Sequence, residues 1–166
     1  MSNINALTIS SFFIKKGVSP LKLQKLLYYS QVWFFVRYGK TLFNDRISGW
    51  IYGPVVNDVW HEFKFIKKGN EIPTNRSRGN KIDNDIVLSH LDEIWKVYGH
   101  FSASELVDLT HKDLPWKESR QDLSYNQPSN NQVLINDETT SYFKLDSSNC
   151  IPKVESTVYY GYYSNF

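Results

Sequence analysis

One stretch decides the fold of this chain: Ser19-Pro20-Leu21-Lys22-Leu23-Gln24-Lys25-Leu26-Leu27-Tyr28-Tyr29-Ser30-Gln31. Ser19 can accept a hydrogen bond from a first-turn amide, and Pro20 fits the first helical position, where no backbone donor is needed. From Leu21 to Tyr38, apolar and aromatic side chains occupy nearly every side of the predicted helix. Such a helix is surrounded by protein rather than laid on a surface. The stretch therefore predicts the buried central helix of a small helical domain.

Working outward, glycines follow four runs of helix-forming residues, at Gly17, Gly39, Gly69 and Gly99. Glycine is common just after a helix because it adopts the left-handed conformation without a Cβ penalty. The runs before these glycines predict helices over about residues 5–16, 20–38, 54–68 and 83–98. In the third run, which begins at Pro54, apolar residues recur at spacings of three and four, as expected for a helix with one buried face.

Between the second and third predicted helices the pattern changes. Ile47, Trp50, Ile51 and Tyr52 favour strands, and turn-forming residues stand on both sides of them. Strand-forming residues between turn signals predict a short strand or hairpin.

The remaining elements are shorter. Ser102 and Glu105 have the capping-box spacing, which predicts a helix from Ser102 to about His111. Pro115 and Trp116 begin a sixth helix that ends near Gln121. Residues 126–132 are Asn, Gln, Pro and Ser only, as is typical of a linker. A brief further helix is expected over about residues 137–143.

These patterns predict a mainly α fold. We expect a compact helical domain around a buried central helix, with a short β-hairpin or strand pair and an irregular C-terminal tail. The domain is expected to span residues 1–123, and a linker with a C-terminal extension residues 124–166. With 166 residues, of which 41% are hydrophobic, the chain is long enough and apolar enough for a genuine core.

Composition narrows the classes of function. A formal net charge of +2 is too small for a protein that coats nucleic acid. The single cysteine, Cys150, excludes an intrachain disulfide and fits a reducing cytosol. The longest apolar stretch, residues 26–36, is shorter than the about 20 residues that span a bilayer. Because no basic stretch precedes an early apolar run, a secretory signal is not expected either. We expect a cytoplasmic protein with no membrane partner.

A search for chemistry gives no complete site. His61 and Glu62 begin like a zinc-protease helix, but Phe65 stands where the second histidine would be needed. No Gly-x-Ser-x-Gly elbow and no glycine-rich phosphate loop occurs. The sequence therefore predicts no catalytic residue, no metal and no cofactor. The enzyme alternative, acting on nucleotides or peptides, requires His61, Glu62 and His111 to converge in one cleft.

One basic cluster is the candidate for nucleic-acid binding. It consists of Lys64, Lys67, Lys68, Arg76, Arg78 and Lys81. A solvated helix end and loop is the commoner role for such residues, and phosphate binding demands a broader positive field than this chain supplies. A nucleic-acid regulator is therefore the weaker alternative.

An ordered set of motifs runs through the first two thirds of the chain. Its members are Ser19 to Gln31, Trp33, Tyr38-Gly39-Lys40, Leu42-Phe43, Ile47, Trp50, Tyr52-Gly53-Pro54-Val55-Val56, Val59-Trp60-His61-Glu62-Phe63, Val97-Tyr98-Gly99, Ser102-Ala103-Ser104-Glu105-Leu106, Leu109-Thr110-His111 and Pro115-Trp116. In this order they resemble the Panacea antitoxin domain, also called SocA-like, over about residues 5–121. Two features depart from the family pattern: the tail from Tyr125 onward, and Asn57 where relatives often carry proline.

The resemblance implies a mostly α binding module of prophages and bacterial toxin–antitoxin operons. Such proteins neutralise a toxin encoded next door, by direct binding or by delivering it to a cellular protease. The toxins paired with this domain are diverse, so the family does not name the toxin. A phage protein that blocks a host defence protein is the alternative, and the oligomeric state stays open.

Exposed-looking clusters predict the partner surface. These are loop residues Arg76, Arg78 and Lys81 and tail residues Tyr159, Tyr160, Tyr162 and Tyr163, since neither set fits an obvious core. Arginine and tyrosine are also enriched at binding hot spots.

The family motif also contains polar or amphipathic residues: Lys22, Gln24, Gln31, Trp50, Tyr52, His61, Thr110, His111 and Trp116. A polar side chain in an otherwise apolar helix usually bonds a neighbouring element. For Gln24 and Gln31 we therefore weigh a structural role slightly above direct contact with a partner.

Overall fold

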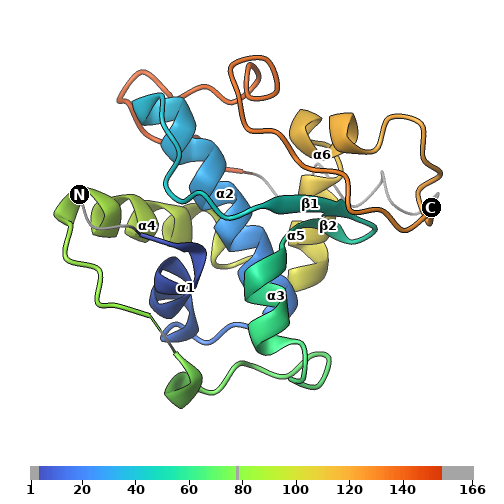
Figure 1. Ribbon diagram of the computed structural model, residues 1–166. Coiled ribbons are helices and arrows are strands. Elements are labelled where there is room, and N and C mark those ends of the chain that lie inside the picture. The colour runs from blue at the N-terminus through green and yellow to red at the C-terminus, as the bar shows by residue number, and fades with distance from the viewer. Residues whose placement is uncertain (1–3, 78, 155–166) are drawn as a thin grey trace.

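The computed structural model describes residues 4–77 and 79–154, which pack around one central helix (Figure 1). Its elements are α1 (Ala6–Ile14), α2 (Pro20–Tyr38), β1 (Ile47–Trp50), β2 (Gly53–Val56), α3 (Asn57–Phe63), the 3₁₀ turn η1 (Thr74–Arg76), α4 (Asp85–Tyr98), α5 (Ala103–Thr110) and α6 (Leu114–Ser119). The expected fold class is confirmed: the chain is mainly helical, with one antiparallel pair of strands.

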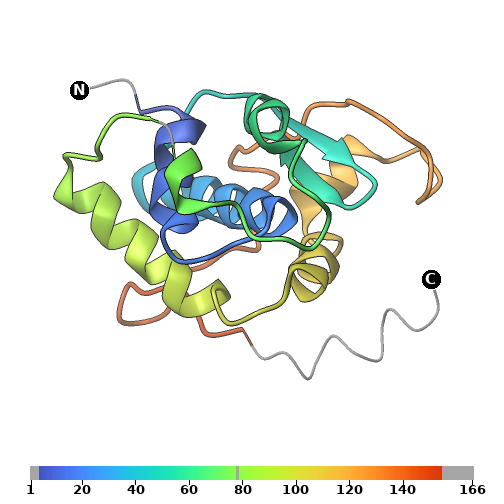
Figure 2. The same ribbon diagram turned by 90° about the horizontal axis from the view of Figure 1, so that it is seen from below.

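Helix α2 passes through the middle of the molecule, with α1 and α4 on one side and the hairpin and α5 on the other (Figures 1 and 2). The Ser19 side chain accepts the Lys22 amide at 3.3 Å, and Gly39 ends the helix with a φ of 69°. Leu23, Leu26 and Leu27 are fully buried. The predicted bounds and the central position of this helix are both confirmed.

Two glutamines of α2 bond the chain that follows the helix. Gln24 accepts the Val56 amide at 2.7 Å and donates to the Val56 carbonyl at 3.3 Å. Gln31 accepts the Leu42 amide and donates to the Phe43 carbonyl, both at 2.7 Å. Residues seven apart lie on one face of a helix. The glutamines therefore hold Leu42, Phe43 and Val56 against a single face of α2.

The hairpin corrects one prediction. The helix expected to begin at Pro54 begins at Asn57, because Gly53–Val56 forms β2 and pairs with β1 in the register Ile47↔Val56 and Trp50↔Gly53. Valines suit a strand as well as a helix, and pairing with β1 together with the bonds from Gln24 decides between the two. Helix α3 also ends earlier than predicted, at Phe63.

Smaller differences concern the other elements. Helix α4 begins at Asp85 rather than Asp83, because the Asn84 side chain caps it. The capping box of Ser102 and Glu105 is present, as predicted. The brief helix expected over residues 137–143 is wrong: hydrogen-bonded turns occupy this segment. There the Asn136 and Thr139 side chains bond each other's backbone amides, which competes with helix formation.

Residues 124–154 pack on the helical body. Beside β1, the Gly49 amide donates to the Asn131 carbonyl and the Val133 amide donates to the Ile47 carbonyl, both at 2.8 Å. The side chains of Val133 and Ile151 are buried in the same core as α2. The division at residue 123 stays a prediction, and Tyr159, Tyr160, Tyr162 and Tyr163 lie outside the described residues.

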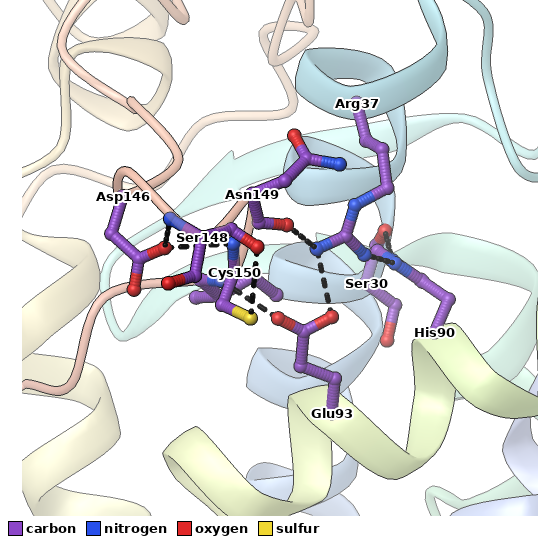
Figure 3. Close-up of polar contacts among 9 residues, drawn as sticks. Ser30, Arg37, His90, Glu93, Asp146, Ser148, Asn149 and Cys150 are labelled. Carbon is purple, nitrogen blue, oxygen red and sulfur yellow. Dashed lines mark hydrogen bonds and ion pairs between the residues drawn. The ribbon is translucent and has the colours of Figure 1, made fainter.

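Arg37 joins α2, α4 and the chain near its described end (Figure 3). Its guanidinium pairs with Glu93 at 2.8 Å and donates to the Asn149 carbonyl at 3.1 Å. His90, also on α4, bonds Arg37 through Nδ1 and the Ser30 carbonyl through Nε2. Burial lowers the pKa of His90 to about 4. The ring is therefore neutral, donating from Nε2 and accepting at Nδ1.

Candidate functional site

An open groove of about 900 Å³ lies beside the hairpin, bounded by the start of α2, by α3 and by the start of α5. Most of its lining is apolar, with large side chains from Leu21, Trp50, Tyr52, Trp60, Phe63 and Ile66. Pockets that bind organic groups are typically of this size and are lined mainly by apolar and aromatic side chains. We refer to this feature as the groove.

Aromatic side chains give the groove its shape. The rings of Trp50 and Trp60 meet edge to face, with centroids 5.2 Å apart. Tyr52 leaves 63% of its surface exposed, whereas Phe63 is buried in the floor. The Lys64 ammonium lies 5.3 Å from the centre of the Trp60 ring, a cation–π distance. The groove therefore combines a fixed floor with rings that remain available for contact.

Side-chain donors from α6 and from the residues that cap α5 and α6 hold the hairpin tip, residues 49–53, in place beside the groove. The Trp116 indole donates to the Trp50 carbonyl at 2.8 Å, and Nε2 of His111 bonds the Ile51 carbonyl at 2.9 Å. Arg120 donates to the Gly49 carbonyl at 2.9 Å. Burial lowers the pKa of His111 to about 4, so its ring is neutral and donates from Nε2. These donors fix the backbone that carries Trp50 and Tyr52.

Lys25 completes the support of the hairpin, although sequence reasoning assigned no role to it. Its side chain is fully buried and donates from Nζ to the Pro54 carbonyl at 2.9 Å. Burial lowers the pKa of Lys25 to about 7. Gly53 has a φ of +104°, and a Cβ there would lie 2.6 Å from Oγ1 of Thr110 and 2.9 Å from Cε of Lys25. Lys25 and Thr110 therefore pack directly under the hairpin tip.

Comparison with known proteins identifies the domain around this groove. A family model described as antitoxin SocA-like, Panacea domain, matches residues 23–117, more than half of the 166 residues. The chain belongs to the SocA-like Panacea family. The match covers the hairpin and α3, which line the groove, and it runs into α6, which supports the hairpin. No curated protein and no solved structure gives a significant match.

Six of the nine polar or amphipathic Panacea motif residues fall into two groups in space. Gln24, Trp50 and Tyr52 line the groove, and Thr110, His111 and Trp116 lie around the hairpin tip. Gln31 bonds the chain after α2, and Lys22 donates to the Gly99 carbonyl at 2.6 Å. Most polar members of the Panacea motif thus hold backbone groups in place, while two aromatic members face the groove.

The predicted partner residues lie elsewhere. Arg76 is exposed, with its guanidinium 4.9 Å from the Phe65 ring, and Lys81 is exposed in the following loop. Neither of these two is among the described residues that line the groove. Arg78 lies outside the described residues, like the four tail tyrosines. Their role in binding stays a prediction.

The histidines of the enzyme alternative have different surroundings. His61 is exposed on α3, with its ring 5.1 Å from that of Trp60. The His111 ring lies below the hairpin tip and stacks on the Trp116 ring, with the two ring centroids 4.2 Å apart. Within residues 4–77 and 79–154, no three histidine, cysteine, aspartate or glutamate side chains are placed to hold a metal ion. In the same ranges, no helix has the length and hydropathy to cross a membrane.

Sequence reasoning missed the groove because it assigned Trp60, Phe63 and Ile66 to the core of a longer helix. The available signal was the crowding of Trp50, Tyr52 and Trp60 within eleven positions. Aromatic residues at this density are typical of binding surfaces as well as of cores. Sequence alone does not separate the two.

Proposed function

We propose that this protein is an antitoxin of a toxin–antitoxin system that neutralises a cognate toxin protein by binding it directly. Membership of the Panacea family supports an antitoxin-like role, and such a role requires a protein partner. The observation that carries the proposal is the groove, in which Tyr52 is exposed, Trp50 and Trp60 are half-buried and the hairpin is held by hydrogen bonds. In this proposal the protein acts in the cytoplasm and has no catalytic role.

The physical basis is the energetics of aromatic contacts. Tryptophan and tyrosine are enriched at binding hot spots because they bury a large apolar area at little cost in conformational entropy. Bonds from Gln24, Lys25, His111 and Trp116 already hold the hairpin in place. A partner that binds there therefore pays little to order this surface. Delivery to a protease would use the same contact with the toxin.

Co-expression with the product of the adjacent reading frame tests the proposal. We expect growth to be rescued and the two proteins to purify together. Tyr52→Ala should weaken the affinity at least tenfold, the effect of losing a hot-spot tyrosine. Tyr142→Ala is the matched control, because Tyr142 is also exposed but does not line the groove. Toxicity that persists beside the unaltered protein would refute the antitoxin role.

A further inference from the structure

The groove carries a charge of one sign at its border. The charged side chains among its described lining residues are Lys64 and Lys68, and both are exposed. Lys64 caps the C-terminus of α3, and Lys68 lies in the loop that follows. Within the described chain, neither lysine takes part in an ion pair. Neither ammonium group is paired with a carboxylate there, so both can meet carboxylates of a partner next to the apolar floor, Lys64 from its position over the Trp60 ring.

The hairpin offers no strand edge to a partner. Along β1, the Gly49 amide and the Ile47 carbonyl are bonded to Asn131 and Val133. Along β2, the outward backbone groups belong to Pro54 and Val56. Their partners in the register, Gly49 and Ile47, direct their own backbone groups to the opposite edge, and in an antiparallel ladder both members of such a pair point away from each other. Gln24 satisfies both groups of Val56, and Lys25 satisfies the carbonyl of Pro54, which has no N–H.

This arrangement limits the kind of segment that can bind. An added strand gains its affinity from main-chain hydrogen bonds along an open edge, and both edges of this hairpin are engaged. A helix satisfies its own backbone and offers side chains only. Its apolar residues at spacings of three and four match an apolar groove.

We infer that the groove takes an amphipathic helix of the toxin, whose apolar face meets Trp50, Tyr52 and Trp60 and whose bordering Asp or Glu residues meet Lys64 and Lys68. This inference rests on the proposed function, because it names the segment of the toxin that the antitoxin binds. It predicts that affinity depends on charge at the border of the groove as well as on its aromatic floor.

The experiment measures binding of the purified toxin to three forms of the antitoxin at low and at high salt. The double variant Lys64→Glu with Lys68→Glu reverses the border charge. Lys15→Glu with Lys40→Glu is the matched control, since it makes the same change in net charge at two exposed lysines outside the groove. Thermal unfolding of each variant confirms that it folds.

We expect the first variant to lose at least tenfold in affinity, with a reduced dependence on salt, and the control to bind like the unaltered protein. Overlapping 20-residue peptides of the toxin should bind only where they are amphipathic and acidic, and should become helical when bound.

The outcomes separate this inference from the proposed function. If the toxin is bound and neutralised equally well by the Lys64→Glu, Lys68→Glu variant, the inference is wrong and the antitoxin role stands. If peptides bind in an extended form, the inference is equally wrong.

Two further outcomes would assign the groove to another occupant and overturn the inference. If deleting residues 155–166 increases the affinity for the toxin, the groove is occupied by the tail. If Trp60→Ala dissociates a dimer, the groove is occupied by a second copy. Failure to bind the toxin at all would remove the proposed function and the inference together.

Discussion

Lys25 occupies a position at which its neighbours on α2 would predict leucine or methionine. Burying an ammonium group is costly, and here the cost is reduced by a pKa of about 7 and by one hydrogen bond to the Pro54 carbonyl. Proline has no N–H, so this point of β2 requires a donor and no acceptor. Lysine supplies donors only, which is the physical reason for its presence under the hairpin.

Lys25 predicts a specific pH dependence of stability. Its pKa is about 7 in the folded protein and 10.5 otherwise, so the unfolded chain binds more protons between these values. Stability contributed by this group therefore rises with pH, starting near pH 7. Lys25→Met should lack this rise, so that the two free energies of unfolding diverge by up to about 1.4 kcal/mol per pH unit.

Urea unfolding at pH 7, 8 and 9 measures this divergence. Work above this range is avoided, because burial raises the pKa of Tyr28 and Tyr29 well above 10 and their ionisation would act in the opposite direction. Lys40→Met, at an exposed lysine, is the control and should follow the unaltered protein. Parallel curves for all three proteins would show that Lys25 does not titrate in this range.

At the scale of elements, the hairpin depends on side chains that substitute for neighbouring strands. Two strands alone are marginally stable in water. Here Gln24 bonds the outer edge of β2 as a further strand would, and residues 131–133 bond the outer edge of β1. Both edges are covered, which also protects the hairpin from pairing with other chains.

Gln24→Leu tests the dependence of β2 on this glutamine. The substitution supplies an apolar side chain of similar size and leaves the amide and carbonyl of Val56 without partners. Each unsatisfied buried group costs about 1–3 kcal/mol, so for the two groups we expect a loss of about 2–6 kcal/mol in the free energy of unfolding. Urea denaturation measures it, with the exposed Gln121→Leu as control. A loss below about 1 kcal/mol would mean that water replaces the glutamine.

At the scale of the whole molecule, residues 124–154 are part of the folded body. Arg120 donates to the Gln127 carbonyl at 2.7 Å, and Val133 and Ile151 complete the core. Arg37 bonds the Asn149 carbonyl and Glu93 bonds the Ile151 amide. The segment is thus held both by apolar burial and by hydrogen bonds to α2 and α4.

Truncation tests this dependence. A chain that ends at Leu123 exposes the edge of β1 and removes two buried apolar side chains, each worth about 1.5–3 kcal/mol. We expect its melting temperature to fall by at least 10 °C and the protein to associate. A chain that ends at Val154 keeps these contacts and should melt at least 10 °C above the chain that ends at Leu123. Equal melting of all three forms would make residues 1–123 an independent domain.

Local signals in the sequence determined much of the fold. Ser19 and Pro20 begin α2, Gly39 ends it, and Ser102 with Glu105 begins α5. Each signal acts within a few residues, so reading them required no knowledge of the tertiary structure. The ordered motifs likewise identified the Panacea family, which the match over residues 23–117 confirmed.

Tertiary structure alone decided the features that concern function. Gly53–Val56 became a strand because β1 and Gln24 bond its two edges, and Lys25 is buried because the Pro54 carbonyl needs a donor. The groove lies beside Trp60 where α3 ends at Phe63, and Lys64, Ile66 and Lys68 continue its lining. The bonds from Gln24 and Lys25 join groups 32 and 29 positions apart in the chain. A pattern of neighbouring residues contains no information on which distant groups meet.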